Sequence, residues 1–156
     1  MTYVDENFLQ GAAMDDFDKK IVAVLQINGR FTNQEVAQQV GLSHSSCSRR
    51  ISRLEKEGVI VGYRALTDRH KLGLSVRAFC GVSRHSDIGW DGLAEKLSTL
   101  EGVVSVFALS GDVDVMLEIV ASDMQAYSQI VQKINKMSEV NATSSSFVLE
   151  EVKTIF

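Results

Sequence analysis

The sequence predicts an α+β protein with two domains, a bundle of three short helices followed by a unit in the order strand, helix, strand, strand, helix, strand. Residues 15–58 place apolar residues at helical spacing between capping and stop signals, whereas the second half alternates apolar strands with two helical stripes. The two halves of the sequence also differ in net charge. Residues 15–73 hold ten lysines and arginines against seven acidic residues, and residues 74–156 hold six against eleven. Because the net charge is −4, a basic surface must be local.

Composition excludes several classes of protein. No stretch approaches about 18 consecutive apolar residues, and Asp5 and Glu6 stand where a secretory signal has cations, so we expect no membrane association and a cytoplasmic location. Cys47 and Cys80 are too few for a disulfide framework and too distant in sequence for a local metal pair, so both are expected as buried thiols. No histidine has a partner at metal-ligand spacing; the three are His44, His70 and His85. We therefore expect neither a metal nor a cofactor.

The first helix is expected to begin at Asp15 or Asp16, either of which can cap it, and to end at the Asn28–Gly29 pair. Four apolar residues recur along it at helical spacing and are expected to face the core: Phe17, Ile21, Val24 and Leu25.

The second helix begins with a capping box. Thr32 and Glu35 are three residues apart, so each side chain can accept a hydrogen bond from the other's backbone N–H. Gly41 is expected to end the helix, whose core-facing residues are Val36, Ala37 and Val40.

The third helix is expected to start at the cap Ser43, bury the stripe Cys47, Ile51 and Leu54, and end at Gly58. A turn of about 100° per residue then places a polar set on the opposite side. That set is Ser45, Arg49, Ser52 and Lys56, flanked by Ser48 and Arg53.

This polar face has two interpretations. One is an ordinary solvated face, with Glu55 and Glu57 keeping its far end near neutral. The other follows from the short turn "VGLS", which joins two helices as in a helix-turn-helix, whose second helix enters the major groove of double-stranded DNA. The candidate DNA-binding residues are Gln34, Ser43, His44, Ser45, Ser46, Ser48, Arg49, Arg50 and Arg53. The segment "VIVGYRAL", residues 59–66, is then expected as a strand at the winged end of the domain.

The second half is expected to fold as a ferredoxin-like split βαβ sandwich, with one face of a four-stranded antiparallel sheet covered by two helices. Its expected strands are "SVRAFCGVS", "VVSVFAL", "VDVMLEIVA" and "TSSSFVLEEV". The other face stays bare, lined by Phe79 and by Phe107 or Leu109. Since a bare apolar sheet is an aggregation liability, a homodimer is expected to cover it.

The stretches "GRFTNQEVAQQVGLSHSSCSRRISRLEKEGVIVGYRAL", "SGDVDV" and "SSFVLEEVK" resemble the leucine-responsive regulatory protein and AsnC (Lrp/AsnC) family of transcription regulators, over about residues 15–154. The resemblance implies a winged helix-turn-helix domain and a ferredoxin-like (RAM) domain that dimerises through its sheets, with tetramers or octamers built from dimers. Two departures stand out: His44 and Ser46 replace prolines found in many members, and Val115 replaces a frequent aromatic residue.

The resemblance also implies a small amino-acid effector, bound between protomers at the "SGDVD" loop. The candidate residues are Leu109, Gly111, Asp112, Asp114, Met124, Thr143 and Ser145. The residue types suit such a ligand. Backbone N–H groups near Gly111 can bind the carboxylate, an aspartate can face the ammonium, and the two hydroxyls share one side of a strand. The plain alternative is an ordinary turn beside a hydroxyl-rich edge.

The expected boundaries are an N-terminal arm (1–14), a helix-turn-helix domain (15–58), a wing or linker strand (59–74) and an effector-binding and oligomerisation domain (75–156). Since no GxSxG or metal motif is present, an enzyme is not expected. A second hypothesis is an amino-acid-binding ACT-like regulatory module without DNA binding.

Overall fold

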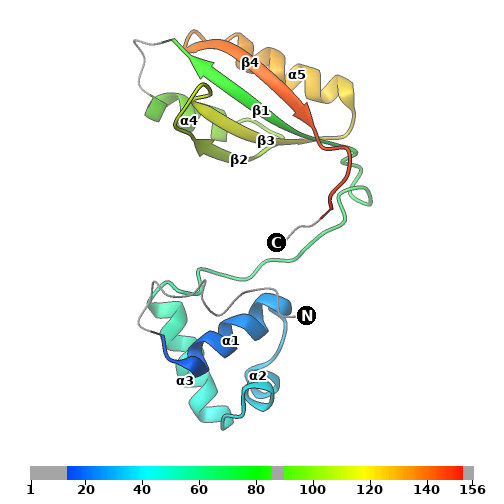
Figure 1. Ribbon diagram of the computed structural model, residues 1–156. Coiled ribbons are helices and arrows are strands. Elements are labelled where there is room, and N and C mark those ends of the chain that lie inside the picture. The colour runs from blue at the N-terminus through cyan, green and yellow to red at the C-terminus, as the bar shows by residue number, and fades with distance from the viewer. Residues whose placement is uncertain (1–13, 86–89, 153–156) are drawn as a thin grey trace. The chain divides into compact units, whose positions relative to one another are not determined.

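The computed structural model describes residues 14–85 and 90–152, so most of the predicted N-terminal arm lies outside the described residues. The chain forms two compact units that meet in the sequence at Leu66 and Thr67. Figure 1 shows three helices in the first unit and a sheet with two helices in the second. The predicted fold class is confirmed.

The first unit consists of α1 (Asp16–Ile27), α2 (Asn33–Val40) and α3 (His44–Lys56). Each begins at a predicted cap: Asp15, Thr32 or Ser43 accepts a hydrogen bond from the backbone N–H three residues ahead. Gly41 ends α2 at φ 75°, a conformation that glycine adopts without steric cost. The predicted α2 and α3 stripes are buried in one apolar core, made of Ile21, Val22, Val36, Ala37, Val40, Cys47, Ile51 and Leu54.

One prediction for helix α1 is wrong. Phe17 was expected in the core but is 39% exposed, and Asp18 is 1% exposed instead. Asp18 precedes Ile21 by three residues and Val22 by four, so it lies on the buried stripe. The Phe17 ring lies instead beside the Arg50 guanidinium, whose carbon is 5.6 Å from the ring centroid. Apolar periodicity missed this arrangement because a charged residue occupies a core position.

The predicted strand over residues 59–66 is wrong. The described chain from residue 59 to residue 75 contains no strand. The segment starts against α3, where the Val59 N–H donates to the Leu54 carbonyl at 2.9 Å, and Tyr63 donates to Glu55 at 3.0 Å. Val61 is 94% exposed.

The second unit has the predicted βαββαβ order. Its elements are β1 (Val76–Arg84), α4 (Trp90–Ser98), β2 (Val103–Ala108), β3 (Val115–Ala121), α5 (Met124–Asn135) and β4 (Val140–Phe147). The strands form one antiparallel sheet in the order β2-β3-β1-β4. β4 begins before the predicted residue 143 and ends at Phe147, because beyond it only the Val148 N–H continues the pairing, with the Arg77 carbonyl at 2.9 Å.

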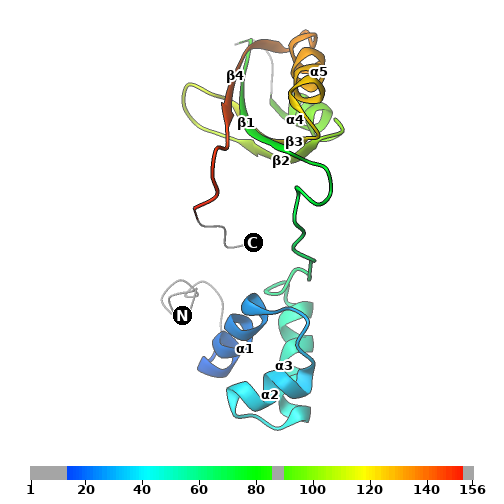
Figure 2. The same cartoon turned by 90° about the vertical axis from the view of Figure 1, so that its right-hand side faces the viewer.

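Both helices cover the same face of this sheet, as Figure 2 shows. Alternate residues of β1 and β3 fill the core beneath them, namely Ala78, Cys80, Val82, Val115, Leu117 and Ile119. The opposite face carries Phe79 and, on the paired strands β2 and β3, Phe107 and Met116. This second set of positions is called the open face below; Phe107 on it is 51% exposed.

Candidate nucleic-acid interface and effector site

The outer side of α3 carries the predicted polar set. All four residues of this set are exposed, namely Ser45, Arg49, Ser52 and Lys56. The apolar stripe on the other side of the helix is buried, namely Cys47, Ile51 and Leu54. Ser45, Ser46 and Arg49 line an open hollow of about 250 Å³ at the start of the helix. Among the described residues, no carboxylate lies within ion-pair distance of Arg49. The face therefore presents hydroxyls and a cation near a helix N-terminus, which suits an anionic partner.

Some side chains at the start of α3 are candidates for DNA contact, whereas other hydroxyls there hold the helix in place. Ser43 accepts from the Ser46 N–H at 3.3 Å as the cap, and Ser48 accepts from Asn33 of α2 at 3.1 Å. His44 and Ser45 are exposed in the first turn. Gln34 is exposed in the first turn of α2.

Arg50 and Arg53 have protein partners, which sequence reasoning did not foresee. Arg50 Nη1 lies 2.6 Å from Asp15 Oδ2 and 2.9 Å from Asp18 Oδ1. Arg53 pairs with the other oxygen of Asp18 and lies 3.9 Å from Glu57. We call these four groups, Asp15, Asp18, Arg50 and Arg53, the α1–α3 ion cluster. Two candidates for DNA contact thus connect α3 to α1.

The loop between β2 and β3 is held by its own backbone and by β1. Leu109 donates to the Asp114 carbonyl at 2.8 Å, and Ser83 donates to the Asp112 carbonyl at 3.2 Å. The Asp114 carboxylate accepts from the Arg84 N–H at 2.9 Å and lies 3.2 Å from Arg84 Nε. Asp112 is exposed. Of the two predicted partners for an ammonium group, Asp114 already neutralises an arginine and Asp112 is accessible.

Thr143 and Ser145 point the same way, as predicted, toward α5. Thr143 donates to Asn135 at 3.0 Å, and Ser145 accepts from Tyr127 at 2.6 Å. Desolvation raises the pKa of the Tyr127 phenol, so the group stays protonated and keeps donating.

Ser144, which the sequence analysis did not select, is the β4 hydroxyl beside the loop on the open face. A Cβ placed on Gly81 would lie 2.9 Å from Ser144 Oγ and 3.1 Å from a methyl of Val113. A side chain at Gly81 would therefore require the Ser144 and Val113 side chains to shift. The pairing of Gly81 with Ser144 could have identified this residue, had the register been known.

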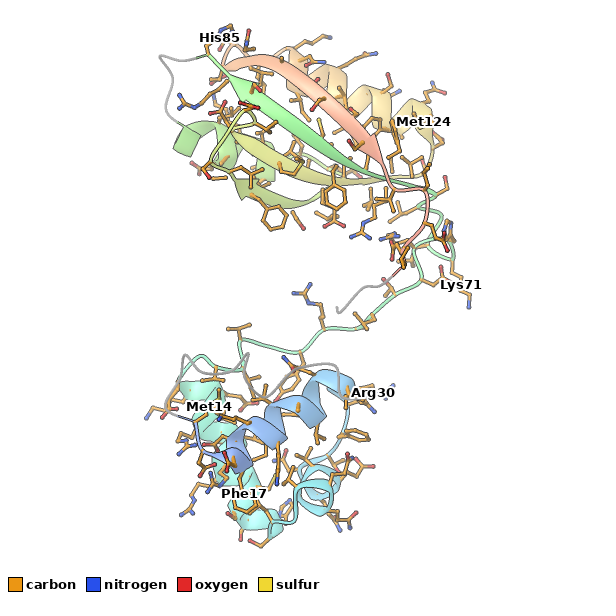
Figure 3. All side chains as sticks on the ribbon, viewed as in Figure 1. Met14, Phe17, Arg30, Lys71, His85 and Met124 are labelled. Carbon is orange, nitrogen blue, oxygen red and sulfur yellow. The ribbon has the colours of Figure 1, made fainter. Side chains whose placement is uncertain are left out.

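Within one chain, Met124 lies far from the β2–β3 loop. The loop leads into Val115, which pairs with Val82, whereas α5 follows Ala121, which pairs with Val76. Those pairs are six positions apart on β1, or about 20 Å at 3.3 Å per residue. Figure 3 places Met124 and His85 at opposite ends of this sheet, so the effector candidates form two separate groups.

Neither metal chemistry nor a membrane span is indicated within residues 14–85 and 90–152. No three His, Cys, Asp or Glu side chains there come together as a metal site would require. No helix of that part is long and apolar enough to cross a membrane. Burial raises the pKa of the thiols of Cys47 and Cys80, which disfavours the reactive thiolate.

Comparison with known proteins agrees with this geometry. Residues 14–61 match a winged helix-turn-helix DNA-binding model, and residues 77–155 match the Lrp/AsnC ligand binding domain. The chain is 34% identical to the leucine-responsive regulatory protein of Escherichia coli (strain K12) over 155 residues, covering 96% of this chain and 93% of that protein. It is 33% identical to the protein of that name from Rhizobium meliloti (strain 1021), with 90% and 92% covered.

Solved structures give the same result. A transcriptional regulator from Neisseria meningitidis in complex with L-Met superposes with a TM-score of 0.86 at 37% identity, covering 90% of this chain and 93% of that one. An AsnC family regulator from Agrobacterium tumefaciens gives 0.83 at 35%, covering 90% and 94%. The helix-turn-helix match disfavours the ACT-like module without DNA binding. The chain belongs to the Lrp/AsnC family of DNA-binding transcription regulators, with a winged helix-turn-helix domain and a ligand-binding domain.

Proposed function

We propose that this regulator contacts DNA through the outer face of α3. The observation that carries the proposal is the hollow at the helix start, lined by the exposed Ser45 and Arg49 and the half-buried Ser46. Arg49 binds a guanine edge or a phosphate, and the hydroxyls contact base edges or phosphates. His44 lies in the same turn, and Gln34 at the start of α2 is placed for a phosphate. Ser43 and Ser48 act chiefly by fixing the start of α3.

The open face supplies the site of homodimerisation. Phe107 is 51% exposed on an antiparallel sheet whose helices lie on the other side, and exposed apolar area of this kind favours burial against a second copy. A dimer carries two α3 helices, one for each half of a two-fold symmetric site. Assembly of dimers into tetramers or octamers is a further possibility that sedimentation distinguishes.

The effector is a small amino acid at the β2–β3 loop. Its carboxylate is bound by backbone N–H groups around Gly111, where φ of 127° suits glycine, and its ammonium by the exposed Asp112. Leu109, 45% exposed, contributes an apolar wall. The L-Met complex of the Neisseria meningitidis relative supports this class of ligand.

The loop residues and Met124 come together in one pocket only when they belong to two different protomers. Met124 is too far from the loop of its own chain, so it contributes to a pocket at the loop only from a second copy. Ser145 accepts from Tyr127 and keeps its own hydroxyl hydrogen to donate, while Thr143 donates to Asn135 and keeps lone pairs to accept. Effector binding then alters DNA affinity by its differential affinity for the assembly states.

The protein acts as a regulator without enzymatic activity, in the cytoplasm where the target DNA lies. The experiment that tests this function is genomic footprinting with and without L-methionine, together with calorimetry of the twenty amino acids on wild type and Asp112→Ala, with Glu150→Ala as an exposed control. Amino-acid-dependent protection and a heat signal lost only in Asp112→Ala are expected. No protected sites would contradict DNA binding, and twenty null titrations would contradict the effector site.

A further inference from the structure

The α1–α3 ion cluster contains a charge that neither DNA contact nor effector binding uses. Among the described residues, Asp18 is the one charged side chain that is buried, with 1% of it exposed. Its two carboxylate oxygens are divided between two arginines of the recognition helix: Oδ1 lies 2.9 Å from Arg50 Nη1, and Oδ2 pairs with Arg53. The Asp15 N–H also donates to Asp18 Oδ2 at 3.2 Å. The buried carboxylate is tolerated because each of its two oxygens pairs with an arginine.

The two arginines lie beside the proposed DNA-contacting face. Arg53 follows Arg49 by four residues, which turns it only about 40° around α3 from that side chain. The Arg53 side chain is 44% exposed, whereas that of Arg50 is 22% exposed and lies closer to α1. An arginine in this position can swing toward a phosphate once its carboxylate partner is removed, because its long side chain is already half in solvent.

Ion pairing with Asp18 has two consequences for DNA binding. It fixes α3 on α1, so that Ser45 and Arg49 are presented in one orientation. Together with Asp15, which also pairs with Arg50, it balances two cations that would otherwise attract any phosphate, and its own share is one charge. Affinity for DNA of arbitrary sequence is set by the number of phosphates that cations neutralise. Base discrimination depends instead on correctly placed side chains in the groove.

We propose that Asp18 is a specificity-determining residue: it holds Arg50 and Arg53 away from the phosphates and fixes the recognition helix, so that discrimination between operator and other DNA depends on it. This inference rests on DNA contact through α3, the proposed function. Arg50 and Arg53 are accordingly positioning residues in the wild-type protein.

The test compares Asp18→Asn with wild type in the full chain. Asparagine keeps the shape and one oxygen acceptor but removes the charge; Asp16→Asn, whose side chain is 92% exposed, is the matched control. Binding is measured to poly(dI-dC) and to the duplex that wild type selects most tightly from a randomised library, between about 50 and 200 mM salt. For poly(dI-dC), the logarithmic salt slope is expected to steepen by about one unit per bound recognition helix. The ratio of selected-duplex to poly(dI-dC) affinity is expected to fall about tenfold. A purely structural role would lower both affinities together and leave the slope unchanged, and that result overturns the proposal.

If Asp18→Asn does not fold, Arg53→Gln tests the claim that Arg53 is held away from phosphate. This variant keeps the Asp18–Arg50 pair and removes only the cation, so the slope on poly(dI-dC) should equal that of wild type. A slope shallower by about one unit would show that Arg53 contacts phosphate already, which overturns the inference. Failure of the proposed function would be recognised separately, because wild type itself would then show no salt-dependent duplex binding.

Discussion

Arg49 and Arg50 are adjacent on α3, but their guanidinium groups have opposite surroundings. Arg50 Nη1 lies 2.6 Å from Asp15 and 2.9 Å from Asp18, and the Arg50 guanidinium carbon lies 5.6 Å from the centre of the Phe17 ring. Arg49 is exposed at the rim of the hollow that it forms with two serines. One residue step turns the helix by about 100°, which separates a structural arginine from one available to a ligand.

Substituting these two arginines by alanine should therefore affect stability very differently. Arg50→Ala leaves Arg53 as the cation paired with the buried Asp18 and should lower the free energy of unfolding by about 2 kcal/mol, less than for a fully uncompensated buried charge. Arg49→Ala should change it by less than about 0.5 kcal/mol. Urea denaturation of both variants measures the difference. Equal free energies of unfolding would show that the ion cluster contributes nothing to stability.

The Asp15 carboxyl should titrate below its ordinary pKa of 3.8. The Asp18 N–H donates to it at 2.9 Å and the Arg50 guanidinium pairs with it, and both favour the ionised form. Because the folded pKa is lowered, this contribution to stability is present above about pH 4 and is lost as the pH falls through the folded pKa.

The measurement is an NMR pH titration of the Asp15 carboxyl carbon. Arg50→Ala should raise the pKa toward 3.8 without fully reaching it, since the Asp18 N–H remains. Arg49→Ala should leave it unchanged. A wild-type pKa at or above 3.8 would refute the ion-pair geometry.

Gly102, just before β2, should tolerate no side chain. Its φ is 89°, and an added Cβ would lie 2.9 Å from the Val120 carbonyl oxygen and 2.6 Å from the end of Ile130. Gly102→Ala should therefore lower the free energy of unfolding by more than about 2 kcal/mol, from left-handed backbone strain and the backbone clash together. Gly58→Ala is the control, because φ there is 73° with open space around the site, so only the strain of about 1 kcal/mol applies. Equal losses in thermal or urea unfolding would contradict the close approach at Gly102.

Phe107→Glu should break the proposed dimer, because it replaces an exposed apolar side chain of the open face with a charge that the interface would bury. Sedimentation at micromolar concentration should show wild type as a dimer or larger assembly and the variant shifted toward monomer. Gln132→Glu, on the exposed side of α5, should sediment as wild type. A wild type that is monomeric would remove the open face as the interface.

Local sequence signals predicted the element order and most of the core. Thr32 and Glu35 form the expected capping box, and Cys47, Ile51 and Leu54 are buried as their spacing indicates. These features depend on residues within about two helical turns of one another, where periodicity and capping rules apply.

The errors and omissions all involve partners distant in sequence. Asp18 is buried because Arg50 and Arg53, more than thirty residues away, neutralise it. Residues 59–66 have the composition of a strand but no neighbour to pair with. Ser144 could be recognised beside the effector loop only from the register between β1 and β4, which strand composition does not determine.

The salt dependence of duplex binding by wild type and Arg49→Ala tests the central claim most directly, that the outer face of α3 binds DNA. Wild-type affinity should fall steeply between about 50 and 200 mM salt. If Arg49 holds a phosphate, Arg49→Ala should reduce the logarithmic slope by about one unit per bound helix; if Arg49 contacts a guanine, it should cost about 1–3 kcal/mol on the selected duplex. A wild type with no salt-dependent binding, or an Arg49→Ala variant identical to it in both slope and affinity, would contradict the account.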